Sequence, residues 1–287
     1  MNSKIIKSKK RIKVLITGAS GFVGSKILKA LIHENAEITL VLRDSSSPKE
    51  KIMHSIKKVI YSDDIFSESV DWWVDSCHDV DVVVHSAWYA EPGKYLKSMK
   101  NLNCLEGSVR LAKGAAKAGV KHFVGIGTCF EYAMSNKPLD VYSKLFPLTL
   151  YASSKLSLYY LLKEFLRLKD IKFTWCRLFY LYGDGEDHRR FIPYLKNQLK
   201  NGEVAELTSG KKVRDFMDVE DAGKVITKTI VHSQDGVVNV CSGKPVTIRE
   251  MAEKIADKYG RRELLKFGAR EDNLIDPDYV VGIPNII

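Results

Sequence analysis

Apolar and polar residues alternate along the first 180 positions in blocks that are typical of strands and helices. Short apolar runs predict strands at 12–17, 37–42, 57–60, 80–85, 121–127 and 171–177. Helical patterns lie between them at 22–33, 68–77, 94–118 and 150–168. Strands that alternate with helices predict an α/β fold with a doubly wound (Rossmann) parallel sheet and right-handed crossovers.

The pattern changes after about residue 178 into shorter pieces. Helices are predicted at 189–201, 219–232 and 247–259, and strands at 204–207 and 237–241. We therefore expect a dinucleotide-binding domain over 1–178, which includes the helix at 150–168. Residues 179–287 are expected to form mainly a small substrate-binding lobe, with short segments that return to the sheet. A chain of 287 residues with 45% hydrophobic content can bury a core of that size.

A glycine-rich turn joins the first predicted strand to the first predicted helix. It contains Gly18, Gly21 and Gly24, spaced as GxxGxxG. A strand, a glycine turn and a helix in this order form a unit whose helix N-terminus and free backbone N–H groups bind a pyrophosphate. A tight turn without a ligand is the alternative, and the flanking elements argue against it.

Tyr151 and Lys155 stand four residues apart in a predicted helix, so both side chains lie on one face. A phenol has an unperturbed pKa of about 10, and a nearby positive charge stabilises its ionised form. Such a tyrosine can pass a proton to or from a carbonyl or alcohol oxygen. Chance surface chemistry is the alternative for an isolated match, and the upstream glycine turn makes that alternative weaker.

With both motifs in this order, the chain resembles the extended short-chain dehydrogenase/reductase superfamily, in its NAD-dependent epimerase/dehydratase branch that acts on nucleotide sugars. The resemblance also includes the segment 82–87, Asn103 in a long helix, and the segment 127–132. It implies a catalytic set of Thr128, Tyr151 and Lys155, in which the lysine also bonds the nicotinamide ribose. It implies further cofactor contacts from Gly18, Ser20, Gly21, Phe22, Val23, Gly24, Asp64, Ile65, His85, Ser86, Ala87, Asn103 and Leu178.

The end of the second predicted strand favours NADP(H) as the cofactor. The family's NAD users usually carry an acidic residue there, whereas this chain has Arg43. Arg43 can pair with a 2′-phosphate and Ser45 can donate to it. NAD(H) stays possible, because Asp44 takes the acidic role if the register shifts by one residue. Asp64 resembles the family's carboxylate near the adenine amino group, and an ordinary loop acid is the alternative.

The residues after Thr128 restrict the reaction. Family members that eliminate water from the sugar carry Asp-Glu at this point, whereas this chain has Cys129-Phe130. Cys129 and His188 also miss the positions that 3,5-epimerisation requires. Two reactions remain: NADPH-dependent reduction of the 4-keto group of a nucleotide-diphospho-4-keto-6-deoxyhexose, and 4-epimerisation with tightly bound NAD. A third hypothesis, from a different class, is a non-catalytic dinucleotide sensor.

The downstream segments resemble 4-ketoreductases of deoxysugar pathways such as CDP-abequose synthase. They are 182–187, 191–194, 214–216 and 267–273. The resemblance implies that Arg214 and Arg270 bind the substrate's diphosphate, a use that suits a planar guanidinium. Surface ion pairing with Asp215 or Glu271 is the alternative for these two arginines.

Composition restricts the possible partners, the metal sites and the location of the protein. The net charge is +10, but no basic stripe interleaved with aromatic residues indicates nucleic-acid binding. Five scattered cysteines without a CxxC pair indicate neither a disulfide framework nor a metal site. No apolar run reaches the roughly 20 residues of a membrane span, and the start lacks the apolar core of a signal peptide. We expect a cytoplasmic homodimer that binds no nucleic acid and no membrane.

Overall fold

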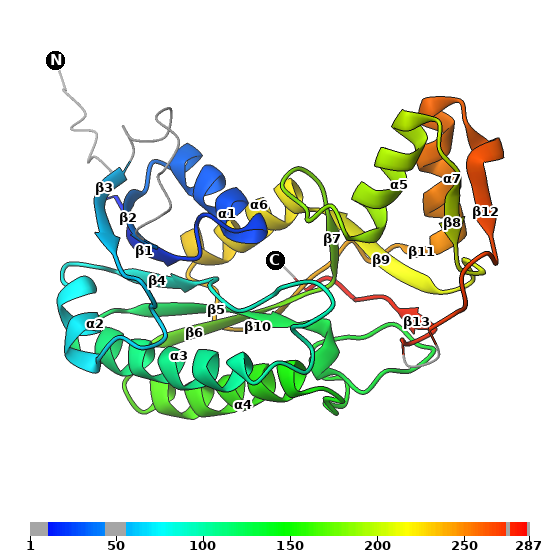
Figure 1. The fold of residues 1–287 in the computed structure, drawn as a ribbon. Helices are drawn as coiled ribbons and strands as arrows, with labels where there is room; N and C mark the ends of the chain where they lie inside the picture. Colours follow the sequence, from blue (N-terminus) through cyan, green and yellow to red (C-terminus); the bar gives the residue numbers. More distant parts are fainter. Residues whose placement is uncertain (1–10, 44–55, 274–275, 286–287) are drawn as a thin grey trace, which may run out of the picture.

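A seven-stranded parallel sheet forms the centre of the molecule. The computed structural model describes residues 11–43, 56–273 and 276–285 (Figure 1). The strand order is β10-β6-β5-β4-β1-β2-β3, and every neighbouring pair is parallel. The strands are β1 (Lys13–Thr17), β2 (Glu37–Leu42), β3 (Ile56–Tyr61), β4 (Val82–His85), β5 (His122–Thr128), β6 (Lys172–Leu178) and β10 (Gly236–Val240). The predicted doubly wound sheet is confirmed.

Helices cover both faces of the sheet (Figure 1). On one face α1 packs against α6, and on the other α3 packs against α2 and α4. The bounds are α1 (Phe22–His33), α2 (Val70–Ser76), α3 (Lys100–Lys117), α4 (Leu150–Arg167) and α6 (Val219–Val231). Both α6 and β10 come from the second half of the chain, so that half contributes to the sheet layer as well as to the smaller lobe.

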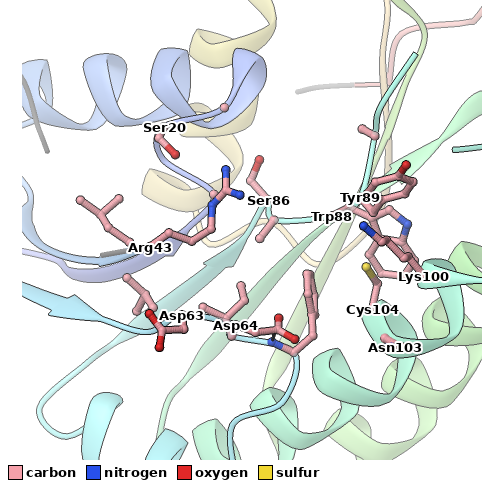
Figure 2. A pocket seen from close by; sticks show the side chains of 18 residues that line it. Ser20, Arg43, Asp63, Asp64, Ser86, Trp88, Tyr89, Lys100, Asn103 and Cys104 are labelled. Carbon is pink, nitrogen blue, oxygen red and sulfur yellow. Dashed lines mark hydrogen bonds between the residues drawn. The ribbon is translucent and has the colours of Figure 1, made fainter. Parts of the chain in front are cut away.

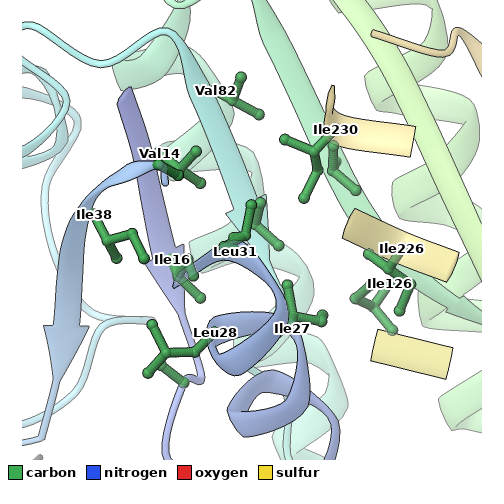
Figure 3. Packing of buried hydrophobic residues seen from close by; sticks show 14 of the residues in the cluster. Val14, Ile16, Ile27, Leu28, Leu31, Ile38, Val82, Ile126, Ile226 and Ile230 are labelled. Atoms are coloured by element: carbon green, nitrogen blue, oxygen red, sulfur yellow. The ribbon is translucent and has the colours of Figure 1, made fainter. Parts of the chain in front are cut away.

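The first strand, β1, shows why the strands of the central sheet appear in the sequence as continuous apolar runs. Val14 and Ile16 pack under α1 and α6, in the cluster that Figure 3 shows with Ile27 and Ile226. Leu15 points the other way, into a second cluster with residues of α3 and α4. A strand that is buried on both faces needs apolar side chains at successive positions, which favours β-branched and leucine residues.

A smaller lobe lies beyond the carboxyl edge of the sheet, at the right of Figure 1. Its helices α5 and α7 pack on each other around a third apolar cluster that contains Leu195 and Ile255. β9 pairs with β7, β11 and β13, while β8 pairs with β12. The bounds are β7 (Tyr180–Tyr182), α5 (Phe191–Asn201), β8 (Ala205–Leu207), β9 (Val213–Asp218), β11 (Pro245–Thr247), α7 (Ile248–Tyr259), β12 (Leu265–Phe267) and β13 (Tyr279–Val280). Two 3₁₀ turns complete the described elements, at Cys129–Glu131 and Arg262–Leu264.

The largest differences from the sequence expectations lie in short or polar segments. The helix expected from residue 94 begins at Lys100, because residues 91–99 form turns that end at the helix start. The strands β7, β9, β11, β12 and β13 were not expected. β9, for example, reads VRDFMD, whose charged residues break the apolar pattern. Within the described residues no helix is both long enough and apolar enough to cross a membrane.

Candidate active site

The glycine turn after β1 leaves its backbone open to a close approach. Gly18 has φ of +75°, and a Cβ there would lie 2.6 Å from the backbone nitrogen of Ala87. A Cβ on Gly24 would lie 2.1 Å from the carbonyl oxygen of Gly18. Only glycine fits at these two positions. The turn leads directly into α1, whose N-terminal N–H groups suit a pyrophosphate, so the residues present fit a dinucleotide.

Two cavities adjoin at this turn. The first, which we call the Arg43 cavity, has a volume of about 540 Å³, and the second, the Tyr151 cavity, about 600 Å³. They share Gly18, Gly21, Ser86, Trp88 and Ala90 as lining residues. Both lie at the carboxyl ends of the parallel strands, where sheets of this type bind ligands.

The Arg43 cavity brings together most of the cofactor contacts expected from the sequence. Those that line it are Gly18, Ser20, Gly21, Arg43, Asp64, Ile65, Ser86, Ala87 and Asn103. Figure 2 shows Arg43 and Ser20 on one side of the cavity, with Asn103 and Cys104 of α3 on the other. Asp64 caps its own turn, because its Oδ1 accepts a hydrogen bond of 3.0 Å from the N–H of Phe66. Ser45, also expected here, lies outside the described residues.

The Tyr151 cavity contains all three predicted catalytic residues. Of the expected residues it is lined by Gly18, Gly21, Phe22, Val23, Gly24, Ser86, Thr128, Tyr151, Lys155 and Leu178. Thr128 ends β5, whereas Tyr151 and Lys155 stand in the first turns of α4. The hydroxyl of Thr149 caps this helix by accepting a hydrogen bond of 3.2 Å from the N–H of Ala152. The helix start thereby fixes Tyr151 beside the end of β5.

Burial keeps the proton on Tyr151. The side chain is only partly exposed, and its ring meets Tyr95 edge-on at 4.8 Å between centroids. Burial raises the pKa of the Tyr151 phenol, the neighbouring Tyr95 raises it further, and a hydrogen bond with the Thr128 side chain acts against both. In this structure the Tyr151 phenol therefore holds its proton.

Lys155 has two partners other than the phenol. Its Nζ donates a hydrogen bond of 2.7 Å to the carbonyl oxygen of Ile126 and lies 3.8 Å from the centre of the Trp88 ring. Burial lowers the pKa of Lys155 to about 7. The sequence predicted that this ammonium would lower the pKa of Tyr151. In the structure burial raises the pKa of Tyr151 instead, and the contacts of the ammonium are with Ile126 and Trp88.

A buried ion pair holds the backbone of Thr128 in place by a hydrogen bond. Glu131 and Arg177 are at most 1% exposed, and Arg177 Nε donates to Glu131 Oε2 at 2.7 Å. The N–H of Thr128 donates to Glu131 Oε1 at 2.9 Å, and Trp175 Nε1 donates to the same carboxylate. A Cβ on Gly127 would lie 2.6 Å from Glu131 Oε1, so this glycine gives the carboxylate its room.

Three predicted ligand contacts lie outside both cavities. His85 is 3% exposed and lies below the glycine turn, where its ring nitrogens pair with the hydroxyls of Thr17 and Ser108 at 2.8 and 2.7 Å. Arg214 is buried and bonds Asp276 at 2.5 Å, behind Tyr180. Arg270 donates to the hydroxyl of Tyr194 at 3.0 Å. These side chains therefore do not face the cavities in this arrangement, and their ligand roles stay predictions.

The lining residues that were not expected as site residues from the sequence include Trp88, Tyr95, Glu186 and Arg190. Trp88 lines both cavities, and Tyr95, Glu186 and Arg190 line the Tyr151 cavity. Trp88 directly follows the 82–87 segment, so its position along the chain was a usable signal. Glu186 and Arg190 lie on the loop between β7 and α5, and no spacing rule connects such a loop with α4.

Residues 14–241 match the model of the NAD dependent epimerase/dehydratase family. The chain belongs to this family. The sequence is 27% identical over 245 residues to dTDP-6-deoxy-L-talose 4-dehydrogenase (NAD(+)) of Aggregatibacter actinomycetemcomitans, covering 85% of this chain and 89% of that protein. It is 24% identical over 273 residues to CDP-abequose synthase of Salmonella muenchen, covering 92% and 87%.

Solved structures of similar fold agree with the family assignment. UDP-N-acetylglucosamine 4-epimerase from Methanobrevibacter ruminantium superimposes with a TM-score of 0.82 at 23% identity, over 96% of this chain and 90% of that chain. UDP-glucose 4-epimerase of Thermus thermophilus, in complex with NAD, superimposes with a TM-score of 0.79 at 19% identity, over 95% and 91%. At such identities the likeness supports the fold.

Replacing the buried carboxylate should destabilise the protein. In Glu131→Gln the guanidinium of Arg177 stays buried without its counter-ion, and breaking a buried pair costs about 3–5 kcal/mol. The free energy of unfolding from urea titrations measures the loss. The matched control is Glu164→Gln, which removes an exposed pair with Arg167 and should cost less than about 1 kcal/mol. Equal losses in the two variants would contradict the role of Glu131.

Lys155 should make stability depend on pH above neutrality. Its pKa is about 7 in the folded protein and 10.5 without burial, so between these values the unfolded chain binds more protons. Stability should rise with pH in this window, by up to about 1.4 kcal/mol per pH unit. Lys155→Met should remove this rise. Unfolding free energies at pH 7, 8 and 9 test it, and parallel curves for wild type and variant would show that Lys155 titrates elsewhere.

Proposed function

We propose that the protein reduces the 4-keto group of a nucleotide-diphospho-4-keto-6-deoxyhexose with NADPH. The observation that carries the proposal is the convergence of Thr128, Tyr151 and Lys155 on one cavity that also includes the glycine turn. The names of two relatives, a dTDP-6-deoxy-L-talose 4-dehydrogenase and a CDP-abequose synthase, support a nucleotide-linked deoxysugar as substrate. A 4-dehydrogenase and a 4-ketoreductase catalyse the same reaction in opposite directions.

The protonated phenol of Tyr151 fits the proton donor that reduction of a ketone requires. A nicotinamide dinucleotide held at the glycine turn would supply the hydride for C4. Tyr151, whose proton is held by burial, donates that proton to the carbonyl oxygen, so the carbonyl becomes an alcohol. The hydroxyl of Thr128 lines the same cavity as the phenol and is the second group that can position the oxygen that receives the proton. Lys155 lies one turn further along α4 and, when charged, stabilises the phenolate that remains.

The acids near Thr128 support reduction over elimination of water. Glu131 stands three residues after Thr128, but it is fully buried, bonded by Arg177, and does not line either cavity. Burial raises the pKa of Cys129 to about 12, which keeps this thiol protonated. His188 is 89% exposed and lines neither cavity, which leaves the pair that 3,5-epimerisation requires incomplete.

The second candidate function is a 4-epimerase with tightly bound NAD. The likeness of fold to two UDP-sugar 4-epimerases favours it. The same catalytic set serves both reactions, and the difference is whether the cofactor leaves after each turnover. A non-catalytic sensor has less support, because the complete catalytic set lines one cavity.

Turnover on defined substrates tests the proposal. With NADPH and a CDP- or dTDP-4-keto-6-deoxyhexose we expect one NADPH consumed per sugar and a single C4 epimer. Tyr151→Phe should lower turnover by about 10²–10⁴ with cofactor affinity retained, because only the donated proton is lost. The control Tyr142→Phe removes an exposed phenol and should leave turnover unchanged. Interconversion of C4 epimers without net NADPH consumption would instead identify the epimerase.

Arg43 tests the choice of cofactor. It lines the first cavity at the end of β2, where it can pair with a 2′-phosphate. Arg43→Ala should weaken NADPH binding by about 1.5–3 kcal/mol, the worth of a charge-assisted hydrogen bond, and leave NADH binding nearly unchanged. The control Lys58→Ala removes an exposed cation from the neighbouring strand, outside the cavity. Equal affinity of the wild type for NADPH and NADH, measured by fluorescence titration, would refute the NADP(H) preference in favour of NAD(H), which the name of one relative includes.

A further inference from the structure

Glu186 lies in the wall of the Tyr151 cavity with one carboxylate oxygen unsatisfied. The residue stands on the loop between β7 and α5 and is partly exposed, but its Oε2 is inaccessible to solvent. Among the described residues Oε2 has no hydrogen-bond partner. A buried acceptor left without a donor costs about 1–3 kcal/mol, so such atoms in folded proteins are met by a protein group, a water or a ligand.

The two neighbouring carboxylates on the loop are already paired. Asp184 bonds the ammonium of Lys26 at 3.0 Å, and this lysine also bonds Glu220 of α6. Asp187 accepts two hydrogen bonds of 2.9 Å from the Arg189 side chain. The Asp184–Lys26 pair attaches the loop to α1, whereas the Asp187–Arg189 pair lies within the loop. Glu186 and Asp187 both line the cavity, and of these two carboxylates only Asp187 is paired with a cation in the part of the chain that the structure describes.

The surroundings of Glu186 poise its carboxyl group near neutrality. Burial raises its pKa to about 7, against a backbone hydrogen bond from Gly183 and the positive charges of Arg190 and Lys196. Arg190 precedes α5 and Lys196 lies within it, so these opposing charges come from the smaller lobe. The cavity also contains Asp187, which is paired, and Lys155 and Tyr151, whose pKa values are shifted by their own burial.

We propose that Glu186 is a ligand-binding residue whose carboxylate turns into the Tyr151 cavity and accepts a hydrogen bond from a hydroxyl or amino group of the bound ligand. This inference rests on the proposed function only in taking the ligand from the dinucleotide and the nucleotide sugar. The donor belongs either to the sugar or to the cofactor. A sugar that carries a carboxylate at this point is disfavoured, because its charge repels an ionised Glu186 and it offers no donor.

The sign of proton exchange on binding tests the proposal. A ligand donor stabilises the carboxylate and lowers its pKa, so binding at pH 7 should release up to about half a proton from Glu186. A ligand that only covers Glu186 would raise the pKa and take up a proton. Isothermal titration calorimetry at pH 7 in phosphate and in Tris separates these outcomes, because the two buffers differ in their heat of protonation.

The three ligands for this titration are NADPH, a nucleoside diphosphate, and the matching nucleoside-diphosphate hexose. Release with NADPH assigns the donor to the cofactor, and release with the hexose but not with the nucleoside diphosphate assigns it to the sugar. Because Lys155 also titrates near pH 7, the quantity to compare is wild type minus Glu186→Gln. Glu203→Gln, an exposed carboxylate outside the cavity, is the control and should behave as the wild type does.

Proton release that disappears in Glu186→Gln supports the proposal. No difference between wild type and Glu186→Gln with any of these ligands, or net uptake that depends on Glu186, would overturn it. The calorimetry needs binding and no turnover. Binding with proton release but without reduction of a keto-sugar would refute the proposed reaction and leave Glu186 assigned. Reduction of a keto-sugar without proton release on binding would support the proposed reaction and refute the assignment of Glu186. Failure of every ligand to bind would refute both the reaction and the assignment.

Discussion

The buried pair of Glu131 and Arg177 connects three neighbouring strands of the central sheet with the backbone of Thr128. Its carboxylate holds the backbone of Thr128 at the end of β5, and its guanidinium comes from β6. Arg177 also donates to the hydroxyl of Tyr132, which in turn donates to Asn239 of β10. Because a buried charge without its partner is costly, these three strands and Thr128, the predicted catalytic threonine, are fixed relative to one another.

Burial also decides the direction in which the pKa values of the two predicted catalytic groups, Tyr151 and Lys155, shift. It disfavours the charged form of each group, so the pKa of Tyr151 rises while that of Lys155 falls to about 7. The phenol therefore keeps its proton, and the lysine changes charge close to physiological pH. Trp88 opposes this effect at Lys155, since an aromatic face favours the charged ammonium. The site thus combines a firmly protonated phenol with a cation that is easily neutralised.

The parts of the fold and site that the sequence predicts are those fixed by local geometry. The glycine turn follows from positive φ and close backbone approach at Gly18, and the Tyr151–Lys155 pair follows from helical spacing. Contacts between segments that are distant in the sequence could not be predicted in this way. Arg214, expected to bind the substrate's diphosphate, is paired with Asp276, 62 positions away in the chain. β9 was not predicted for the same reason. The partners of its charged residues are distant in the sequence, and no local pattern indicates them.

The location of the acids narrows the chemistry that the Tyr151 cavity supports. Elimination of water needs an acid and a base beside the sugar ring, in addition to the tyrosine. Glu131 is near Thr128 in the chain but turns inward, since Gly127 leaves room for its carboxylate beside Trp175 and Arg177. Two carboxylates remain in the cavity wall, and Asp187 is committed to Arg189. Among the described residues Glu186 is then the one carboxylate of the cavity wall that is not paired with a cation. A single carboxyl group cannot serve as both acid and base for elimination, so its position suits a hydrogen bond with a ligand donor better.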